Sequence, residues 1–160
     1  MPRLIEFMAI IAIVFSFGWT TFQRNFVWND DLSLWQDVMS KSPNKARPRY
    51  NLGVIFQERG LDDKATESYQ RAIALKIDYA DAYTNLGQLY LKKDLAEKAV
   101  EYFKLALMFD PTQKIALFNL GIIYLEQGSI EEARTEFNAV LAIDPSFDQA
   151  RQFLQYMGKQ

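Results

Sequence analysis

Few residues in this sequence could carry acid–base or metal chemistry. It contains no histidine and no cysteine. Without imidazole or thiol groups, Ser-His and Cys-His catalysis, disulfides, iron–sulfur clusters and zinc sites built on those ligands are excluded. Adjacent carboxylates remain, at Asp30-Asp31, Asp62-Asp63 and Glu131-Glu132. Neighbours in sequence do not face each other on a helix, so none of these pairs is expected to act as an acid–base couple.

The other charged residues do not indicate a ligand. Asp62-Asp63 and Glu131-Glu132 fall at predicted helix starts, where acidic side chains complement the helix dipole. Lys92-Lys93 is a short basic pair within a chain of net charge −2. Two adjacent lysines do not form a basic surface that could bind nucleic acid. The glycines follow no phosphate-binding pattern. We therefore predict no catalytic residue, no metal, no small-molecule cofactor and no nucleic-acid partner: the chain is not expected to be an enzyme.

The elements that would position a site follow from a 34-residue internal period. Asn51-Leu52-Gly53 recurs as Asn85-Leu86-Gly87 and again as Asn119-Leu120-Gly121. The same spacing relates a set of small and aromatic residues: Ala65, Ala99 and Ala133, then Tyr69, Phe103 and Phe137. A fixed period of this size is typical of a solenoid, in which each repeat stacks on the next.

Each recurring residue has a packing role in a pair of helices. Gly87 on the first helix and Ala99 on the second allow close approach, and Phe103 fills the space beside them. The turn between the helices is predicted at residues that tolerate a left-handed backbone: Gly60, Asp94 and Gly128. Pro111 and Pro145 end the second helices, because proline cannot continue a helix.

These residues resemble the tetratricopeptide repeat, whose Asn-Leu-Gly, aromatic, alanine and proline positions they match. The resemblance covers three units, at 46–79, 80–113 and 114–147. It implies an all-α, right-handed α-solenoid of helix pairs. Residues 148–160 are predicted to form a capping helix, since Ala150, Phe153, Leu154 and Met157 make an apolar stripe. Residues 29–43 match the second helix of a repeat whose first helix is missing.

The N-terminal segment has the length and composition of a membrane anchor. Residues 4–22 carry one charge, Glu6, and a helix of that length rises about 28 Å, close to the thickness of a hydrocarbon core. We predict a transmembrane anchor over 4–23 and a single-pass membrane protein. A buried helix and a cleaved signal peptide are the alternatives. The few basic residues, Arg3, Arg24 and Lys41, lean towards a cytoplasmic C-terminal part.

The resemblance implies that the first helices line a concave groove, which in this family binds extended peptides or partner helices. One asparagine per repeat, at Asn51, Asn85 and Asn119, could bind a peptide backbone; alternatively, these side chains are simply solvated. Apolar groove positions in the third unit indicate a partner site, or a surface that the capping helix or a neighbouring molecule covers. The carboxylate clamp of some family members is not expected, because Tyr50 and Val54 occupy two of its positions. The predicted contact residues are Asn51, Asn85, Asn119, Tyr50, Gln88, Phe118, Ile122 and Leu125.

Residues 20–53 also resemble the junction at which O-mannosyltransferase-like membrane proteins pass from their last membrane helix into tetratricopeptide repeats. The shared residues are Arg24-Asn25, Trp28, Leu34-Trp35 and Ser42-Pro43. In such proteins the repeats lie outside the cytoplasm, and this favours an extracytoplasmic repeat array here. We expect a membrane-anchored module that binds a protein or peptide partner. The alternatives are an accessory or C-terminal portion of a membrane glycosyltransferase-like protein that presents acceptor polypeptide, and a soluble scaffold.

Overall fold

The computed structural model describes residues 31–158, and this part of the chain is all-α, with eight helices and no strand. The chain divides into two compact parts, 1–43 and 44–160. In the first part, α2 spans Asp31–Lys41 and places Asp31 in its first turn and Lys41 in its last, as the helix dipole favours. The predicted anchor over 4–23 lies outside the described residues. Among the helices that are described, none combines the length and apolar character needed to cross a membrane.

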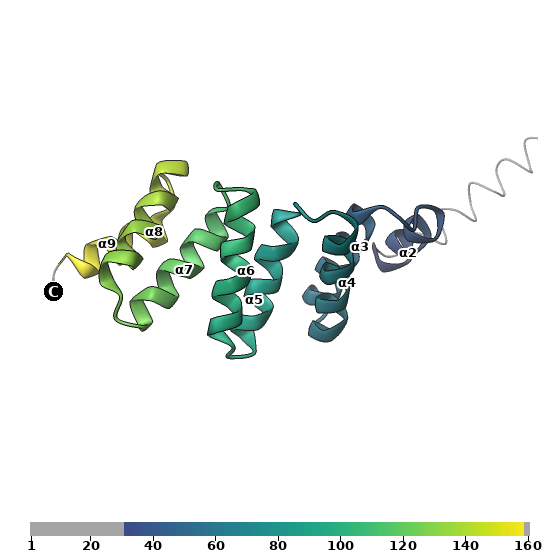
Figure 1. Ribbon diagram of the computed structural model, residues 1–160, viewed down its shortest axis with the longest axis horizontal. Helices are drawn as coiled ribbons and strands as arrows, with labels where there is room; N and C mark the ends of the chain where they lie inside the picture. The colour runs from purple at the N-terminus through teal and green to yellow at the C-terminus, as the bar shows by residue number, and fades with distance from the viewer. Residues whose placement is uncertain (1–30, 159–160) are drawn as a thin grey trace, which may run out of the picture. The chain divides into compact units, whose positions relative to one another are not determined.

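The second part is an array of helix pairs followed by a single helix (Figure 1). Short loops join the members of each pair, and the two helices of a pair pack on each other more extensively than on the next pair. The bounds are α3 Ala46–Glu58 and α4 Asp62–Leu75, α5 Ala80–Lys92 and α6 Ala96–Phe109, α7 Lys114–Glu126 and α8 Ile130–Ile143, and then α9 Asp148–Met157. A stack of helix pairs of this kind is an α-solenoid.

Glycine and an aromatic ring hold each pair together. A Cβ atom placed on Gly87 would lie 2.5 Å from the Phe103 ring, and Gly53 and Gly121 stand in the same way against Tyr69 and Phe137. The ring therefore occupies space that any other residue in the first helix would fill. This close approach explains why a residue that weakens helices recurs in the middle of each first helix.

The same aromatic residues join one pair to the next. Phe103 of α6 is fully buried, and it lies in one core cluster with Ala116, Leu120 and Ile123 of α7. Tyr69 of α4 belongs to an equivalent cluster that includes residues of α5. Tyr69 and Phe103 thus pack within their own pairs and against the following one, which makes the core continuous along the array.

The turns inside the pairs adopt the predicted left-handed backbone. Gly60 has φ of 72° and Gly128 has φ of 76°, and the non-glycine residue Asp94 has φ of 59° at the equivalent position. A left-handed residue ends a helix by redirecting the chain while backbone N–H groups bond the last free carbonyls. The Leu95 N–H, for example, donates to the carbonyl of Tyr90 at 2.9 Å.

The last helix, α9, covers the end of the array with its apolar side. Ala150 and Met157 are buried in a cluster with Phe137, and Phe153 stacks on the Phe137 ring at 5.1 Å between centroids. Exposed polar residues form its other side. The apolar stripe predicted from the sequence is therefore the side of α9 that packs on α7 and α8.

Candidate functional site

Aromatic and polar side chains from three helices of the array surround a pocket of about 450 Å³. We call it the tyrosine pocket. Helix α3 supplies four lining residues, and α4 and α5 supply one each. The lining residues are Tyr50, Val54, Gln57, Glu58, Tyr69 and Asn85. All but Tyr69 lie on the first helices, the elements whose side chains were predicted to form the groove.

A hydrogen-bond network fixes the geometry of the tyrosine pocket. The Asn85 Nδ2 group donates to the hydroxyl oxygens of Tyr69 at 3.1 Å and Tyr50 at 3.3 Å. The Tyr69 hydroxyl in turn donates to Gln57 Oε1 at 2.7 Å. Both N–H groups of Asn85 are thus used, whereas its Oδ1, the Tyr50 O–H and the Gln57 amide N–H groups have no partner among the described residues.

The tyrosines of this network are neutral at ordinary pH. Burial, reinforced by the Asp81 carboxylate, raises the pKa of Tyr50. Burial also raises the pKa of Tyr69, and the hydrogen bond from Asn85 lowers it by a smaller amount. Tyr79 packs on Tyr50 with ring centroids 4.9 Å apart. Each phenol therefore keeps its proton and is a hydrogen-bond donor as well as an acceptor.

The three predicted ladder asparagines do not share one environment. Asn85 bridges the two tyrosines, whereas Asn119 turns back and donates to the carbonyl of Ile115 in its own helix at 2.7 Å. Asn51 is half-buried on α3, with no side-chain hydrogen bond to any residue in the described part. Gln88 is also half-buried, one turn beyond Asn85 on α5. The structure thus brings Tyr50 and Asn85 together, and leaves Asn51, Gln88 and Asn119 outside the pocket lining.

The apolar groove positions of the third unit pack against the end of the array. Phe118, Ile122 and Leu125 are half-buried and lie against the core cluster that includes α9. The Phe118 ring lies 5.1 Å from Phe147 and 5.9 Å from Phe153, between centroids. These intramolecular contacts agree with the alternative in which the last helix covers this surface.

Tyr69 lines the pocket but is not among the contact residues predicted from the sequence. It occupies the aromatic position held by Phe103 and Phe137 in the other units, so its ring has the ordinary packing role. Only the first unit carries a hydroxyl there, and this hydroxyl connects Gln57 with Asn85. A departure from the repeat consensus that adds a polar atom to a buried ring is the signal that could have identified it.

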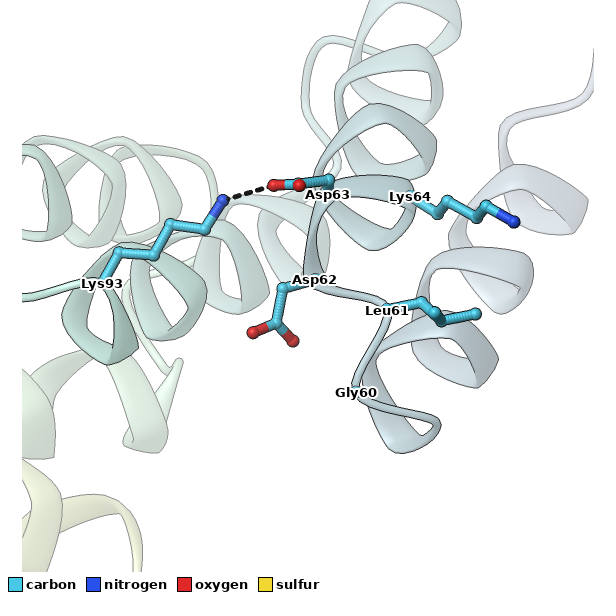
Figure 2. A pocket seen from close by; sticks show the side chains of 6 residues that line it. All are labelled: Gly60, Leu61, Asp62, Asp63, Lys64 and Lys93. Carbon is cyan, nitrogen blue, oxygen red and sulfur yellow. Dashed lines mark hydrogen bonds and ion pairs between the residues drawn. The ribbon is translucent and has the colours of Figure 1, made fainter.

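A second pocket, of about 470 Å³, lies at the turn between α3 and α4. In Figure 2, Lys93 reaches Asp63 while Lys64 points away from them. The Lys93 and Asp63 charged groups lie 2.8 Å apart, and Lys92 makes a similar contact of 2.7 Å with Asp62. These opposite charges pair with one another across successive helix pairs; the two lysines and Asp63 are exposed, and Asp62 is half-buried. We therefore assign these ion pairs a structural role.

The described residues offer no site for metal chemistry. Within 31–158, no group of three or more carboxylate, imidazole or thiolate side chains lies close enough together to hold a metal ion. The chemistry available in the tyrosine pocket is hydrogen bonding, aromatic contact and the charge of one carboxylate, Glu58. This set offers hydrogen-bond donors and acceptors, aromatic surface and one negative charge.

Two comparisons with known families match most of the array. A family model described as TPR repeat matches residues 55–94, and one described as tetratricopeptide repeat matches residues 91–155. Together with the helix pairs and their glycine–aromatic contacts, these matches identify the chain: it belongs to the tetratricopeptide repeat family. This fold is generally a scaffold for protein interactions.

Solved structures share the fold. A crystal structure of MamA has a TM-score of 0.69 at 23% identity, over 80% of this chain and 75% of that one. The first TPR of Spaghetti (RPAP3), bound to an HSP90 peptide, has a TM-score of 0.66 at 20% identity, over 72% of this chain and 91% of that one. The Arabidopsis OM64 TPR domain has a TM-score of 0.66 at 21% identity, over 72% and 95%.

A curated relative is similar over a shorter stretch. A protein O-mannosyl-transferase of Caenorhabditis elegans is 36% identical over 59 residues, which are 37% of this chain and 9% of that protein. The chain thus spans less than a tenth of the length of this relative.

Proposed function

We propose that the protein is an interaction module that binds an extended polypeptide segment along the first helices of its repeat array. The observation that carries this proposal is the tyrosine pocket, where an organised network leaves polar groups unused on the predicted groove side. Pockets with a few oriented polar groups among apolar and aromatic side chains are typical binding sites. No catalytic role is proposed for any residue.

The unused groups suit a peptide backbone. The Tyr50 O–H and the Gln57 amide can donate to carbonyl oxygens, and the Asn85 Oδ1 can accept from an N–H group. Because Asn85 is held by two tyrosines, little side-chain entropy is lost when a ligand meets it. Asn51 and Gln88 lie nearby on the same two helices and are proposed to extend the contact, with Asn119 continuing it on α7.

One solved neighbour supports peptide binding in general terms. The RPAP3 domain is described as bound to an HSP90 peptide, and its fold is similar to that of this chain. The peptide class is expected to differ, because Tyr50 and Val54 replace two residues of the carboxylate clamp. Phe118, Ile122 and Leu125 remain proposed contact residues, but a ligand would reach only the parts of these side chains that α9 does not cover.

Selection from random peptides tests the proposal. Phage-displayed random dodecamers would be selected on the full 160-residue chain in mild detergent, and the affinity of selected peptides measured. We expect Asn51→Ala combined with Asn119→Ala to weaken binding at least threefold without loss of helicity. Asn138→Ala, an exposed asparagine on the second helix α8, is the matched control and should have no effect. Failure to select any peptide, or equal affinities of both variants, would contradict the proposal.

Membrane attachment is part of the proposal and rests on the sequence alone. Residues 4–23 are proposed to anchor the repeats to a membrane, because they form an apolar stretch of spanning length with aromatic residues following it. The repeats are proposed to lie on the extracytoplasmic side, as the junction resemblance implies.

A second candidate function is that of an accessory or C-terminal portion of a glycosyltransferase-like protein. The similarity to an O-mannosyl-transferase at 36% identity favours it. In that case the tyrosine pocket would hold acceptor polypeptide for an active site elsewhere. Finding several further hydrophobic segments encoded directly upstream of Met1 would support this candidate, and a gene that starts at Met1 would argue against it.

A further inference from the structure

We infer that the tyrosine pocket receives a cationic side chain, that of a lysine or an arginine, from the bound polypeptide. This inference names the ligand chemistry of the site and rests on the proposed function.

The charge of the pocket lining favours a cation. Glu58 is the sole ionised side chain among the six lining residues, and it forms no ion pair with any residue that the structure describes. It lies in the last turn of α3, where the free carbonyls of the helix end add partial negative charge. The Asp81 carboxylate adds to the negative field at Tyr50. The positive charge of Arg47 lowers the pKa of Tyr79, and this tyrosine does not line the pocket.

The polar groups of the pocket are oriented so that acceptors are left for a ligand. Asn85 directs both of its N–H groups to tyrosine oxygens, and Tyr69 directs its hydroxyl proton to Gln57. The strongest acceptor left in the lining is the Glu58 carboxylate, followed by the Asn85 carbonyl. An ammonium or guanidinium group brings several donors and no acceptor, so it matches these atoms. The Tyr50 hydroxyl and the Gln57 amide remain for a neighbouring peptide carbonyl.

The aromatic lining also suits a cationic side chain. Tyr50 is half-buried and presents its ring to the pocket, and the fully buried Tyr69 ring stands behind it with ring centroids 5.6 Å apart. Aromatic rings attract cations through their quadrupole, and they accommodate the methylene stem of a lysine or arginine. An acidic side chain would instead meet Glu58 and the end of α3. A purely apolar side chain would desolvate the carboxylate without pairing it.

The third repeat supplies a matched control for Glu58. Glu126 stands 68 residues later, two periods along, in the last turn of α7, and it is also exposed. It does not line the tyrosine pocket. Glu58→Gln and Glu126→Gln therefore remove the same charge from equivalent exposed positions, and neither removes a core contact.

The first test uses small probes on the full chain with isotope-labelled tyrosine rings. N-acetyl-lysine methylamide and N-acetyl-arginine methylamide should shift the Tyr50 and Tyr69 ring signals saturably. The norleucine and glutamine analogues should shift them at least threefold less at equal concentration. Glu58→Gln should weaken the lysine and arginine responses at least threefold, and Glu126→Gln should leave them unchanged. Equal responses to lysine and norleucine, or to the two variants, would overturn the inference.

The peptide selection separates this inference from the proposed function. Selected dodecamers should carry lysine or arginine at one aligned position, and Glu58→Lys should shift the preference at that position to aspartate or glutamate. Peptides that bind and lose affinity in the Asn51 and Asn119 variant, but show no basic position, would overturn the inference and leave the proposed function standing. Tyrosine shifts by the lysine probe without any selected peptide would support the pocket and contradict the proposed function.

Discussion

At the scale of single residues, the glycine of each first helix is the most constrained position. We expect Gly87→Ala to destabilise the array by about 1–3 kcal/mol, the range for overpacking a filled core. The added Cβ would lie 2.5 Å from the Phe103 ring, which is fully buried and has nowhere to move. Urea unfolding followed by circular dichroism measures the change.

A second glycine provides the control for that substitution. At Gly60 no neighbouring atom lies within 4 Å of an added Cβ. Gly60→Ala should therefore lower the free energy of unfolding by only about 1 kcal/mol, because alanine is strained in the left-handed backbone of this position. If Gly87→Ala lowers the free energy of unfolding no more than Gly60→Ala does, contact with the Phe103 ring is not the reason that position 87 requires glycine.

Asn85 affects the titration of two tyrosines. Asn85→Ala removes the hydrogen bonds that lower the pKa of Tyr50 and Tyr69, so both pKa values should rise further above 10.0. The substitution also leaves two phenol oxygens short of a donor, and we expect a loss of about 1–2 kcal/mol. Ultraviolet titration of the phenols and urea unfolding check the two effects. Asn119→Ala, whose amide bonds its own helix, should change neither phenol.

The sign of the alkaline response follows from the same groups. A tyrosine with a raised pKa in the folded state stabilises the fold fully below the unfolded value of 10.0, and this contribution is lost as the pH rises through the folded value. Stability should therefore decline above about pH 10.

The sequence predicts the residues that repeat and misses those that break the repeat. Gly87 and Phe103 could be paired because three copies show the same small and large positions. The Tyr50–Asn85 contact joins residues 35 positions apart, one more than the period, and Tyr69 differs from its counterparts by one hydroxyl. The repeat pattern does not predict such a contact, because side-chain packing between two neighbouring units determines it.

At the scale of elements, the C-terminal helix depends on the turn that precedes it. Lys114 Nζ at the start of α7 lies 2.6 Å from the Asp144 carboxylate, just after α8. This hydrogen bond, together with two from Ser146, lowers the pKa of Asp144 to about 2. A lowered carboxyl pKa stabilises the fold above the unfolded value of 3.8, and this stabilisation is lost as the pH falls towards 2.

We therefore expect acid to loosen α9 first in the array. The protection factors of the α9 amides against hydrogen exchange, taken relative to the intrinsic rate at each pH, should fall between pH 4 and pH 2, and Asp144→Asn should reduce this dependence. Glu132→Gln, an exposed carboxylate in the first turn of α8, is the control. An unchanged acid profile in Asp144→Asn would show that the turn does not hold the helix.

The elements themselves were predictable because their signals are local. The apolar stripe from Ala150 to Met157 indicated a helix, and α9 spans Asp148–Met157. The partner of that stripe was less predictable. The apolar surface around Phe118 was predicted to be a partner site, with a covering helix or a neighbouring molecule as the alternative. The ring contacts with Phe147 and Phe153 favour the covering helix.

At the scale of the whole molecule, the absence of cysteine permits a topology experiment. A single cysteine added after Gln160 should react with a membrane-impermeant thiol reagent in intact cells, if the repeats lie outside the cytoplasm as proposed. The protein should fractionate with membranes. Labelling only after lysis would place the repeats on the cytoplasmic side, and recovery in the soluble fraction would contradict the anchor over 4–23.

The glycine–aromatic contact also determines how the array should respond to force. Within each pair the helices are closely packed around a ring that fits against a glycine, whereas successive pairs meet over a smaller surface. A pull along the array should therefore separate neighbouring pairs before it opens any pair. Under load, the helix pairs of the array should stay intact, and the extension should come from the contacts between successive pairs.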